Sequence, residues 1–403
     1  MATLDILPTQ IDFSALHARM QWYVDERIIP HCVCLVMRGT DVLDYRTLGY
    51  MDLESREPLR EDAIFRMYSN TKIVTSVAAM MLFEEKRFEL DDPVARFIPS
   101  FSDLQVLRPG AKSAKDVEPA RSPITMRQIL SHSAGLSYGV FEPTSVVDQL
   151  YAQAGLHLLS DTDGTLENLC EVVSRLPLAF QPGTNWRYSV STDVTARVIE
   201  VISGQRFDVF LKERILDPLG MADTDFHVPA EKQHRFTTMY APVDLFAPMK
   251  GGLNKADDPL SGMYSRPHAM LAGGHGLVST VADYVTFLRA LIKGGEWHGV
   301  RLLQAETLEL MRTNQLADGV SVHFPMWEMK DNVFGLGFAL KQAPADGEPE
   351  TAVGEYHWGG IAGTHSWMAP RAGIAGVCMT QRMPGFWHPF SQEFKRMVYE
   401  QLG

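Results

Sequence analysis

Ser69 and Lys72 are the residue pair with the clearest potential for chemistry. They lie three positions apart in the segment FRMYSNTK, which holds the only Ser-x-x-Lys pattern of the chain. The apolar residues that follow recur at helical spacing and predict a helix: Ile73, Val74, Val77, Ala78, Met81 and Leu82. Ser69 is therefore expected at the start of this helix and Lys72 one turn in, with both side chains on one helix face.

This arrangement can generate a nucleophile. A serine hydroxyl becomes nucleophilic when a neighbouring base takes its proton. Burial and the positive end of a helix both disfavour an ammonium group and lower the pKa of a lysine. The backbone N–H groups at the helix start can stabilise an oxyanion. In the alternative interpretation, Ser69 is an N-cap and Lys72 is solvated. Because the helix is apolar on more than one face, we expect its start to be buried.

Two other segments carry residues that could complete such a site. The turn PGTNWRYSV delivers Tyr188 just before a helix that is predicted from about residue 192 to Gly204. A tyrosine beside a protonated lysine has a lowered pKa and can shuttle protons. The segment His357-Trp358-Gly359-Gly360-Ile361 places paired glycines at a strand end, where a substrate can approach the backbone closely. The structural alternatives are an ordinary core-edge tyrosine and a β-bulge beside a packed tryptophan.

Taken together and in this order, the segments resemble the serine beta-lactamase and penicillin-binding-protein superfamily, and most closely the family VIII carboxylesterases with the class C beta-lactamase fold. The resemblance covers nearly the whole chain. The matching stretches are Ser69-Asn70-Thr71-Lys72, residues 90–94 (LDDPV), residues 129–136 (ILSHSAGL), the Pro-Gly turn before Tyr188-Ser189, and residues 277–280 (LVST).

The resemblance implies a role for each candidate residue. Ser69 is the nucleophile, with Lys72 and Tyr188 as its proton-transfer partners, and the sequence leaves open which of the two is the base. The backbone N–H groups of Ser69 and Ile361 would form the oxyanion hole. Trp358-Gly359-Gly360 stands in the place of the Lys-Thr-Gly strand motif. The expected substrate-binding residues are His357, Trp358, Gly359 and Gly360.

Two departures from the family pattern bear on the substrate. The usual Tyr-x-Asn is here Tyr188-Ser189-Val190, and the lysine of Lys-Thr-Gly is replaced by Trp358. The loss of an amide and a cation, together with the gain of an indole, points away from anionic beta-lactams and toward a neutral, fairly apolar ester.

A second nucleophile pattern, Gly-x-Ser-x-Gly, occurs at residues 135–139 with Ser137 at its centre. In that motif a strand enters the turn and a helix leaves it. A helix is predicted before this turn, and Phe141-Glu142-Pro143 follows it, so we do not expect Ser137 to be the nucleophile.

The pattern of elements predicts an α+β, beta-lactamase-like fold. Strand signals lie near both ends of the chain, at 33–37, 42–48, 334–340, 356–361, 365–369 and 373–381, and a helix-rich stretch lies between them. We therefore expect a mostly antiparallel sheet flanked by helices, built by residues 1–95 and 270–403. Residues 96–269 would form an inserted helix-rich domain that carries substrate-pocket loops.

The individual helices and loops are also predicted. Helices are expected at 13–27, 124–130, 280–292 and 389–401. A further helical stretch is expected at 144–178, interrupted by a turn at 161–164. Residues 91–99 are read as a short helix, and 105–123 and 241–272 as loops.

The composition limits the partners. The chain has 403 residues and a net charge of −12, which argues against nucleic acid or an anionic membrane as the main partner. No signal peptide, apolar run of membrane-spanning length, metal-ligand cluster or cofactor motif is recognised. The four cysteines, Cys32, Cys34, Cys170 and Cys378, are expected to be buried free thiols, with Cys32 and Cys34 on one strand face. A cytoplasmic location is expected, and the oligomeric state is not predicted.

The sequence thus predicts a serine carboxylesterase that hydrolyses short-to-medium acyl esters through an acyl-enzyme on Ser69, without cofactor or metal. The alternatives within the superfamily are a beta-lactamase or D-alanyl peptidase, and an acyltransferase. A non-catalytic binding protein is a further alternative, although Ser69, Lys72 and Tyr188 are all present.

Overall fold

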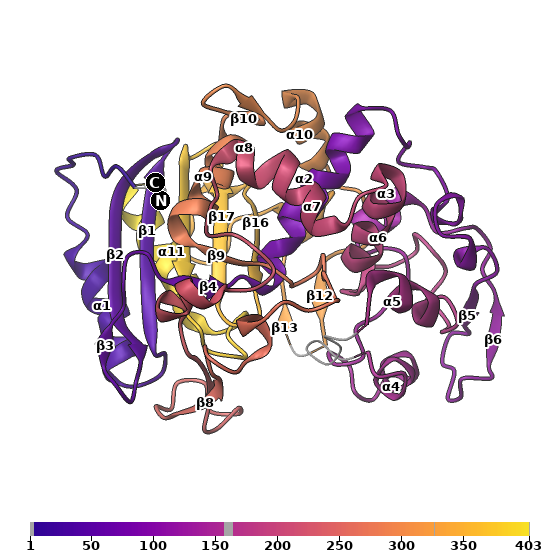
Figure 1. Ribbon diagram of the computed structural model, residues 1–403, viewed down its shortest axis with the longest axis horizontal. Coiled ribbons are helices and arrows are strands. Elements are labelled where there is room, and N and C mark those ends of the chain that lie inside the picture. Colours follow the sequence, from indigo (N-terminus) through magenta and orange to yellow (C-terminus); the bar gives the residue numbers. More distant parts are fainter. Residues whose placement is uncertain (1–3, 157–163, 326, 403) are drawn as a thin grey trace.

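An eight-stranded antiparallel sheet is the centre of the computed structural model, which describes residues 4–156, 164–325 and 327–402 (Figure 1). Five strands from the C-terminal part of the chain lie beside three from the N-terminal part, in the order β14-β15-β16-β17-β18-β1-β2-β3, and the two groups pair through β18 and β1. Their bounds are Asn332–Phe334 (β14), Ala339–Lys341 (β15), Tyr356–Gly360 (β16), Thr364–Ala369 (β17), Ile374–Met379 (β18), His31–Arg38 (β1), Asp41–Asp52 (β2) and Glu57–Pro58 (β3).

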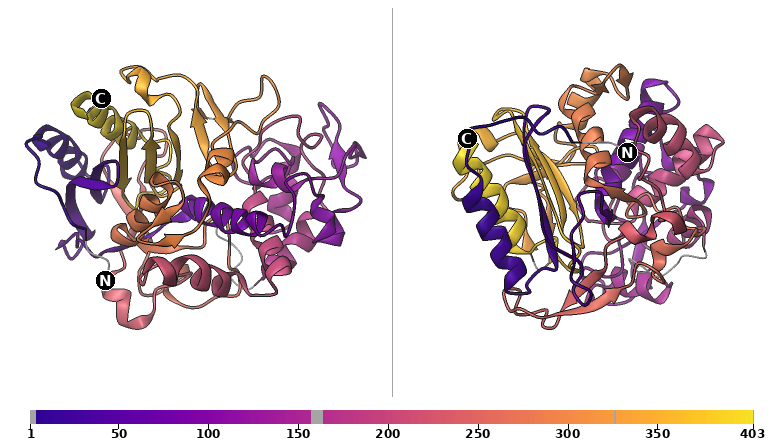
Figure 2. Two further views of the ribbon diagram at one scale, coloured as in Figure 1. Left: turned by 90° about the horizontal axis from the view of Figure 1, so that it is seen from above. Right: turned by 60° about the vertical axis from the view of Figure 1, so that its left-hand side comes forward.

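Helices cover both faces of this sheet. Helices α1 (Ser14–Asp25) and α11 (Pro389–Leu402) lie side by side on one face (Figure 2). Helices α2 (Thr71–Glu84) and α9 (Val281–Ile292) contribute to the core on the other face. Thr280 caps α9 by accepting a hydrogen bond from the Asp283 N–H at 3.2 Å. This arrangement is the predicted beta-lactamase-like α+β fold.

Strand β1 shows how the sequence builds two cores. Val33, Leu35 and Met37 point into the core shared with α2, whereas Cys32 and Cys34 point toward α1 and α11. This alternation follows from the period of two along a strand. As predicted, Cys32 and Cys34 share a face, with their sulfur atoms 3.9 Å apart, and all four cysteines are buried and free.

The helix-rich part lies beside the sheet, on the right of Figure 1. Its helices are α3 (Met126–Leu130), α4 (Val146–Gln153), α5 (Leu166–Val173), α6 (Ser191–Ser203), α7 (Phe207–Leu211) and α8 (Asp217–Leu219). Gly204 ends α6 in the left-handed conformation, as its position predicted. Most of the turn expected at 161–164 lies outside the described residues.

Three details of the prediction are wrong. Residues 91–99 form the 3₁₀ turn Val94–Arg96 rather than a helix, and Pro99 begins the next such turn, Pro99–Phe101. The expected strand 334–340 is two strands, because Gly337, at φ +98°, turns the chain between β14 and β15. The two expected loops contain short hairpins that pair β5 (Gln105–Leu107) with β6 (Val117–Pro119), and β7 (Met239–Pro242) with β8 (Leu253–Asp257).

The remaining elements are short. They comprise α10 (Ala305–Met311) and the strand pairs β4 (Ile64–Arg66) with β9 (Val278–Thr280), β10 (Glu296–Trp297) with β11 (Val300–Arg301), and β12 (His323–Phe324) with β13 (Trp327–Glu328). Within the described residues, no helix has the length and apolar character needed to cross a membrane.

Candidate active site

Ser69 is held in a tight turn at the start of a helix that is buried from Thr71 to Leu82. It belongs to the 3₁₀ turn Tyr68–Asn70, and α2 begins at the next residue. Tyr68 has a φ of +44°, an unfavourable backbone conformation for a large side chain. Asn70 fixes the turn against the sheet by donating to the Thr364 carbonyl at 3.0 Å. The prediction that this helix starts inside the protein is confirmed, because Ser69 and Lys72 are both buried.

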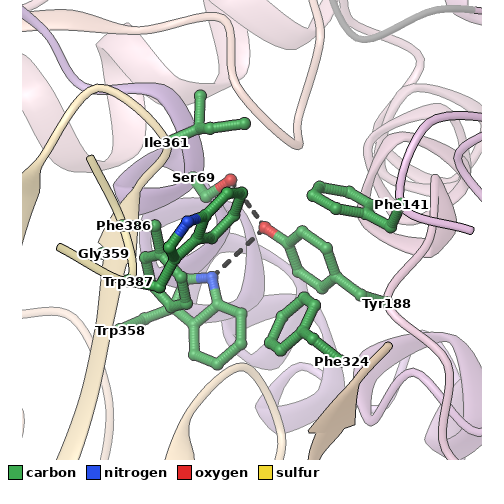
Figure 3. Close-up of a pocket in the computed structure, with 9 residues that line it drawn as sticks. All are labelled: Ser69, Phe141, Tyr188, Phe324, Trp358, Gly359, Ile361, Phe386 and Trp387. Carbon is green, nitrogen blue, oxygen red and sulfur yellow. Dashed lines mark hydrogen bonds between the residues drawn. The ribbon is translucent and has the colours of Figure 1, made fainter. Parts of the chain in front are cut away.

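Two side chains reach the Ser69 hydroxyl, one from the helix that follows it and one from a distant segment. The Tyr188 hydroxyl lies 2.6 Å from Ser69 Oγ (Figure 3). Lys72 Nζ lies 3.3 Å from the same oxygen. Tyr188 comes from the segment just before α6, and Lys72 from the first turn of α2. The structure therefore brings together the three residues for which the sequence predicted catalytic roles.

Lys72 is surrounded by hydrogen-bond acceptors in a buried site. Its Nζ donates to the Gly274 carbonyl at 2.6 Å and to the Tyr138 hydroxyl at 2.8 Å. Burial lowers the pKa of Lys72 to about 7, and the nearby Asp193 carboxylate opposes this shift. Asp193 also accepts a hydrogen bond from the Gly274 N–H at 2.8 Å. Near neutral pH, Lys72 is thus partly unprotonated and able to accept a proton.

The expected pKa shift of Tyr188 is wrong in sign. Burial raises the pKa of Tyr188, and the hydrogen bonds to Ser69 and Trp358 reduce that effect only in part. The expected shift required a protonated lysine beside the tyrosine, whereas burial favours the neutral forms of both groups. Tyr188 is therefore a proton donor in the resting site.

Aromatic rings form most of the wall around Ser69. The pocket is lined by Ser69, Phe141, Tyr188, Phe324, Trp358, Gly359, Ile361, Phe386 and Trp387 (Figure 3). Trp358 directs its indole N–H to the Tyr188 hydroxyl at 3.3 Å. No lysine or arginine belongs to this lining, within the part of the chain that the structure describes. The pocket thus presents an apolar surface to a substrate.

The two glycines of β16 allow close backbone packing beside the Ser69 turn. A Cβ at Gly360 would lie 2.5 Å from the Met67 carbonyl oxygen and 3.1 Å from Tyr68 Cβ. Ile361 follows directly and lines the same pocket as Ser69. The N–H groups of Ser69 and Ile361 thus belong to residues at one pocket, where a pair of donors can stabilise an oxyanion.

His357 is placed differently from the other predicted substrate-binding residues. It precedes Trp358 on β16, so its side chain points to the opposite face of the sheet. Its Nε2 lies 3.0 Å from Asn332 Oδ1, and it is not part of the lining around Ser69. Burial keeps the pKa of His357 well below its usual value.

The Ser137 hydroxyl is engaged in hydrogen bonds to two charged side chains, which suits a structural role. Its hydroxyl donates to Asp148 and accepts from Arg187 Nε at 2.8 Å. The segment connects α3 to α4, so no strand leads into it. The prediction that this Gly-x-Ser-x-Gly pattern is not a nucleophile elbow is consistent with this geometry.

The sequence analysis missed several residues of the site. Tyr138 and Asp193 surround Lys72, and Phe141, Phe324, Phe386 and Trp387 line the pocket. Tyr138 was visible only as part of the Gly-x-Ser-x-Gly segment. Asp193 lies in the first turn of α6, and the four aromatic residues come from loops and a short strand, where no spacing rule brings them together.

A Ser-Lys-Tyr cluster at the start of a buried helix, beside an antiparallel sheet, is the arrangement of a serine hydrolase with a beta-lactamase-like fold. The chain belongs to the Beta-lactamase family, whose model matches residues 16–393. This membership confirms the predicted superfamily.

Three relatives illustrate the range of the family. Esterase EstB of Burkholderia gladioli is 31% identical, with 94% of each chain covered. The structure of EstCE1, described as a hydrolase with promiscuous acyltransferase activity, superposes with a TM-score of 0.78, 25% identity and coverage of 95% of this chain and 97% of that one. Monacolin J acid methylbutanoyltransferase of Aspergillus terreus is 27% identical, with 94% of this chain and 93% of that protein covered.

Proposed function

We propose that the enzyme is a serine carboxylesterase of the family VIII type, which hydrolyses short-to-medium acyl esters through an acyl-enzyme on Ser69. The observation that carries the proposal is the position of Ser69 Oγ, 2.6 Å from the Tyr188 hydroxyl and 3.3 Å from Lys72 Nζ. The aromatic lining, with Trp358 in the place of the lysine of the Lys-Thr-Gly motif, supports a neutral substrate.

The proposed acylation step uses both proton-transfer residues. Unprotonated Lys72 takes the Ser69 proton while Oγ attacks the ester carbonyl carbon. The N–H groups of Ser69 and Ile361 stabilise the resulting oxyanion. Tyr188 then donates its proton to the leaving alkoxide, which departs as the alcohol. Lys72 is left as an ammonium and Tyr188 as a phenolate.

Deacylation restores both groups. The Tyr188 phenolate takes a proton from a water molecule, which attacks the acyl carbonyl. When the second tetrahedral intermediate collapses, the Lys72 ammonium returns its proton to Ser69 and the carboxylic acid is released. All transferred protons are thereby accounted for, and no cofactor or metal takes part in this cycle.

An acyltransferase is the second candidate. It differs only in that an alcohol, rather than water, attacks the acyl-enzyme. The acyltransferase activities in the names of EstCE1 and of the Aspergillus terreus relative favour this candidate over a beta-lactamase or D-alanyl peptidase. Added methanol distinguishes the two activities, because transfer yields a methyl ester and hydrolysis yields the free acid.

The proposal also covers the partner of the enzyme and its location in the cell. We propose a small-molecule ester as the partner, with no role for nucleic acid or membrane, in line with the net charge of −12. A cytoplasmic location is supported by the four free thiols, which are typical of a reducing compartment.

The proposal is tested by comparing hydrolysis of p-nitrophenyl butyrate and of a chromogenic cephalosporin by wild type and Ser69→Ala. We expect fast ester cleavage that is lost in the variant, together with slow or no cephalosporin opening. Cephalosporin turnover that rivals the ester would contradict the esterase assignment and favour the beta-lactamase alternative.

A further inference from the structure

The pocket at Ser69 is small in this conformation. Its free volume is about 10 Å³, close to the space that one water molecule needs. An acyl group longer than a few carbon atoms therefore requires additional space. The side chains around Ser69 that can move determine where that space opens.

A much larger groove lies directly beyond one wall of the pocket. It has a volume of about 760 Å³ and shares two lining residues with the pocket, Trp358 and Phe386. Behind this wall, Trp327 and Met329 provide apolar surface, and the Trp327 ring lies 5.5 Å from that of Phe386. The groove and the catalytic pocket thus meet at Trp358 and Phe386, although much of the groove lies on the α11 face of the sheet, where charged side chains such as Lys341 and Lys395 also line it.

Phe386 is the residue of this wall whose side chain no hydrogen bond holds. Trp358 donates a hydrogen bond to Tyr188, whereas the half-buried Phe386 ring packs against four other rings, those of Phe324, Trp327, Trp358 and His365. The backbone beside Phe386 is fixed, because Gly385 donates to the Ile361 carbonyl at 2.6 Å. A rotation of the Phe386 side chain would join the two spaces without moving the chain.

The geometry of the reaction indicates which part of the ester enters the groove. The leaving oxygen must lie near the Tyr188 hydroxyl, which protonates it. Tyr188 and Phe141 occupy one side of the pocket, and Phe386 lies on the other side with Gly359 and Trp358 (Figure 3). The acyl group, attached to the other side of the carbonyl carbon, is therefore directed toward Phe386.

We propose that Phe386 determines the acyl-chain length that the enzyme accepts. A medium-length acyl chain displaces its ring and extends into the groove along Trp327 and Met329. The inference rests on the proposed esterase function and names the acyl subsite of that same site.

The test compares p-nitrophenyl butyrate with p-nitrophenyl octanoate in wild type and Phe386→Ala. We expect the octanoate-to-butyrate ratio of kcat/KM to rise about tenfold in the variant. Adding Met329→Trp, which narrows the groove beside Trp327, should remove that gain. If the alanine variant does not fold, Phe386→Leu replaces it, and Met329→Trp alone should lower the ratio.

Phe141→Ala is the matched control, because it removes an equal aromatic ring from the Tyr188 side of the same pocket. It should not raise the octanoate-to-butyrate ratio. An unchanged ratio in folded Phe386→Ala, or an equal rise in Phe141→Ala, would overturn the inference while ester hydrolysis itself persists. Wild type without activity on either ester would instead contradict the proposed function.

Discussion

The Tyr188 hydroxyl lies 2.6 Å from Ser69 Oγ, although the two residues are 119 positions apart in the chain. Backbone hydrogen bonds hold this approach, because Arg187 donates to His132 at 2.9 Å and Val190 donates to Ser137 at 3.1 Å. The turn that carries Tyr188 therefore rests on the loop after α3. The helix-rich part thus brings the Tyr188 hydroxyl to Ser69, whose turn is fixed against the sheet.

The two candidate nucleophiles should respond differently to the loss of their hydroxyls. Ser69→Ala should abolish ester turnover with an unchanged melting temperature. Ser137→Ala should keep most of the activity but lower the free energy of unfolding by about 1.5–3 kcal/mol, because it loses hydrogen bonds to the charged Asp148 and Arg187. Initial rates and thermal denaturation measure both effects. A folded but inactive Ser137→Ala would contradict its structural role.

The pH dependence of catalysis should follow Lys72. Its pKa is lowered to about 7 by burial, and the amine must be unprotonated to accept the Ser69 proton. We therefore expect kcat/KM to fall as the pH decreases through about 7, where the amine gains a proton. A rate profile that is flat across this range would argue against Lys72 as the base.

Asp193→Asn should shift the fall of kcat/KM on the acidic side of the pH–rate profile, the acidic limb, to lower pH. The negative charge of Asp193 raises the pKa of Lys72, so its removal lowers that pKa further and keeps the amine unprotonated in more acidic solution. Asparagine still offers an oxygen to the Gly274 N–H. Asp91→Asn, at an exposed carboxylate paired with Arg127, is the control and should leave the limb in place. An unshifted limb in Asp193→Asn would contradict the proposed charge interaction.

Tyr138→Phe should lower kcat more than it changes KM. The phenol oxygen accepts from Lys72 at 2.8 Å, and its loss leaves the amine less firmly positioned toward Ser69. A loss of about 1.5 kcal/mol corresponds to a rate decrease of about tenfold. Tyr151→Phe, which removes a buried hydroxyl on α4 outside the pocket lining, is the matched control. Equal effects of the two substitutions would indicate a general packing defect.

Gly360→Ala should reduce both activity and stability. The added methyl group would meet the Met67 carbonyl oxygen at 2.5 Å and would push β16 away from the Ser69 turn. We expect kcat to fall about tenfold or more, because small displacements of reacting groups cost large factors in rate. Gly39→Ala, where a Cβ meets nothing within 4 Å, should cost about 1 kcal/mol of stability and leave kcat unchanged. Wild-type kcat in Gly360→Ala would show that the close approach is not needed.

The sequence predicted those features that follow from local periodicity or from ordered motifs. This group includes the helix after Ser69, the strands expected at 33–37 and 42–48, and the convergence of Ser69, Lys72 and Tyr188. Tyr138 and Asp193 were missed because only tertiary packing brings them to Lys72. The short strands β6 and β8 have polar sequences of low strand propensity, and backbone pairing within hairpins defines them instead.

The pKa of Tyr188 depends on a property that the sequence patterns do not predict, the depth of burial. The sequence indicated which residues meet but not how deeply they are buried. Burial reverses the expected shift of the tyrosine pKa and lowers that of Lys72, which is why the proposed mechanism uses the neutral lysine as the base.

The identity of the nucleophile is tested most directly by covalent labelling. Diethyl p-nitrophenyl phosphate, which phosphorylates activated serines, is added to wild type, Ser69→Ala and Ser137→Ala, and the adducts are mapped by peptide mass spectrometry. The account predicts a single diethylphosphoryl group on the peptide that contains Ser69, present in wild type and Ser137→Ala and absent in Ser69→Ala. Labelling at Ser137, or ester turnover that persists in unlabelled, folded Ser69→Ala, would contradict it.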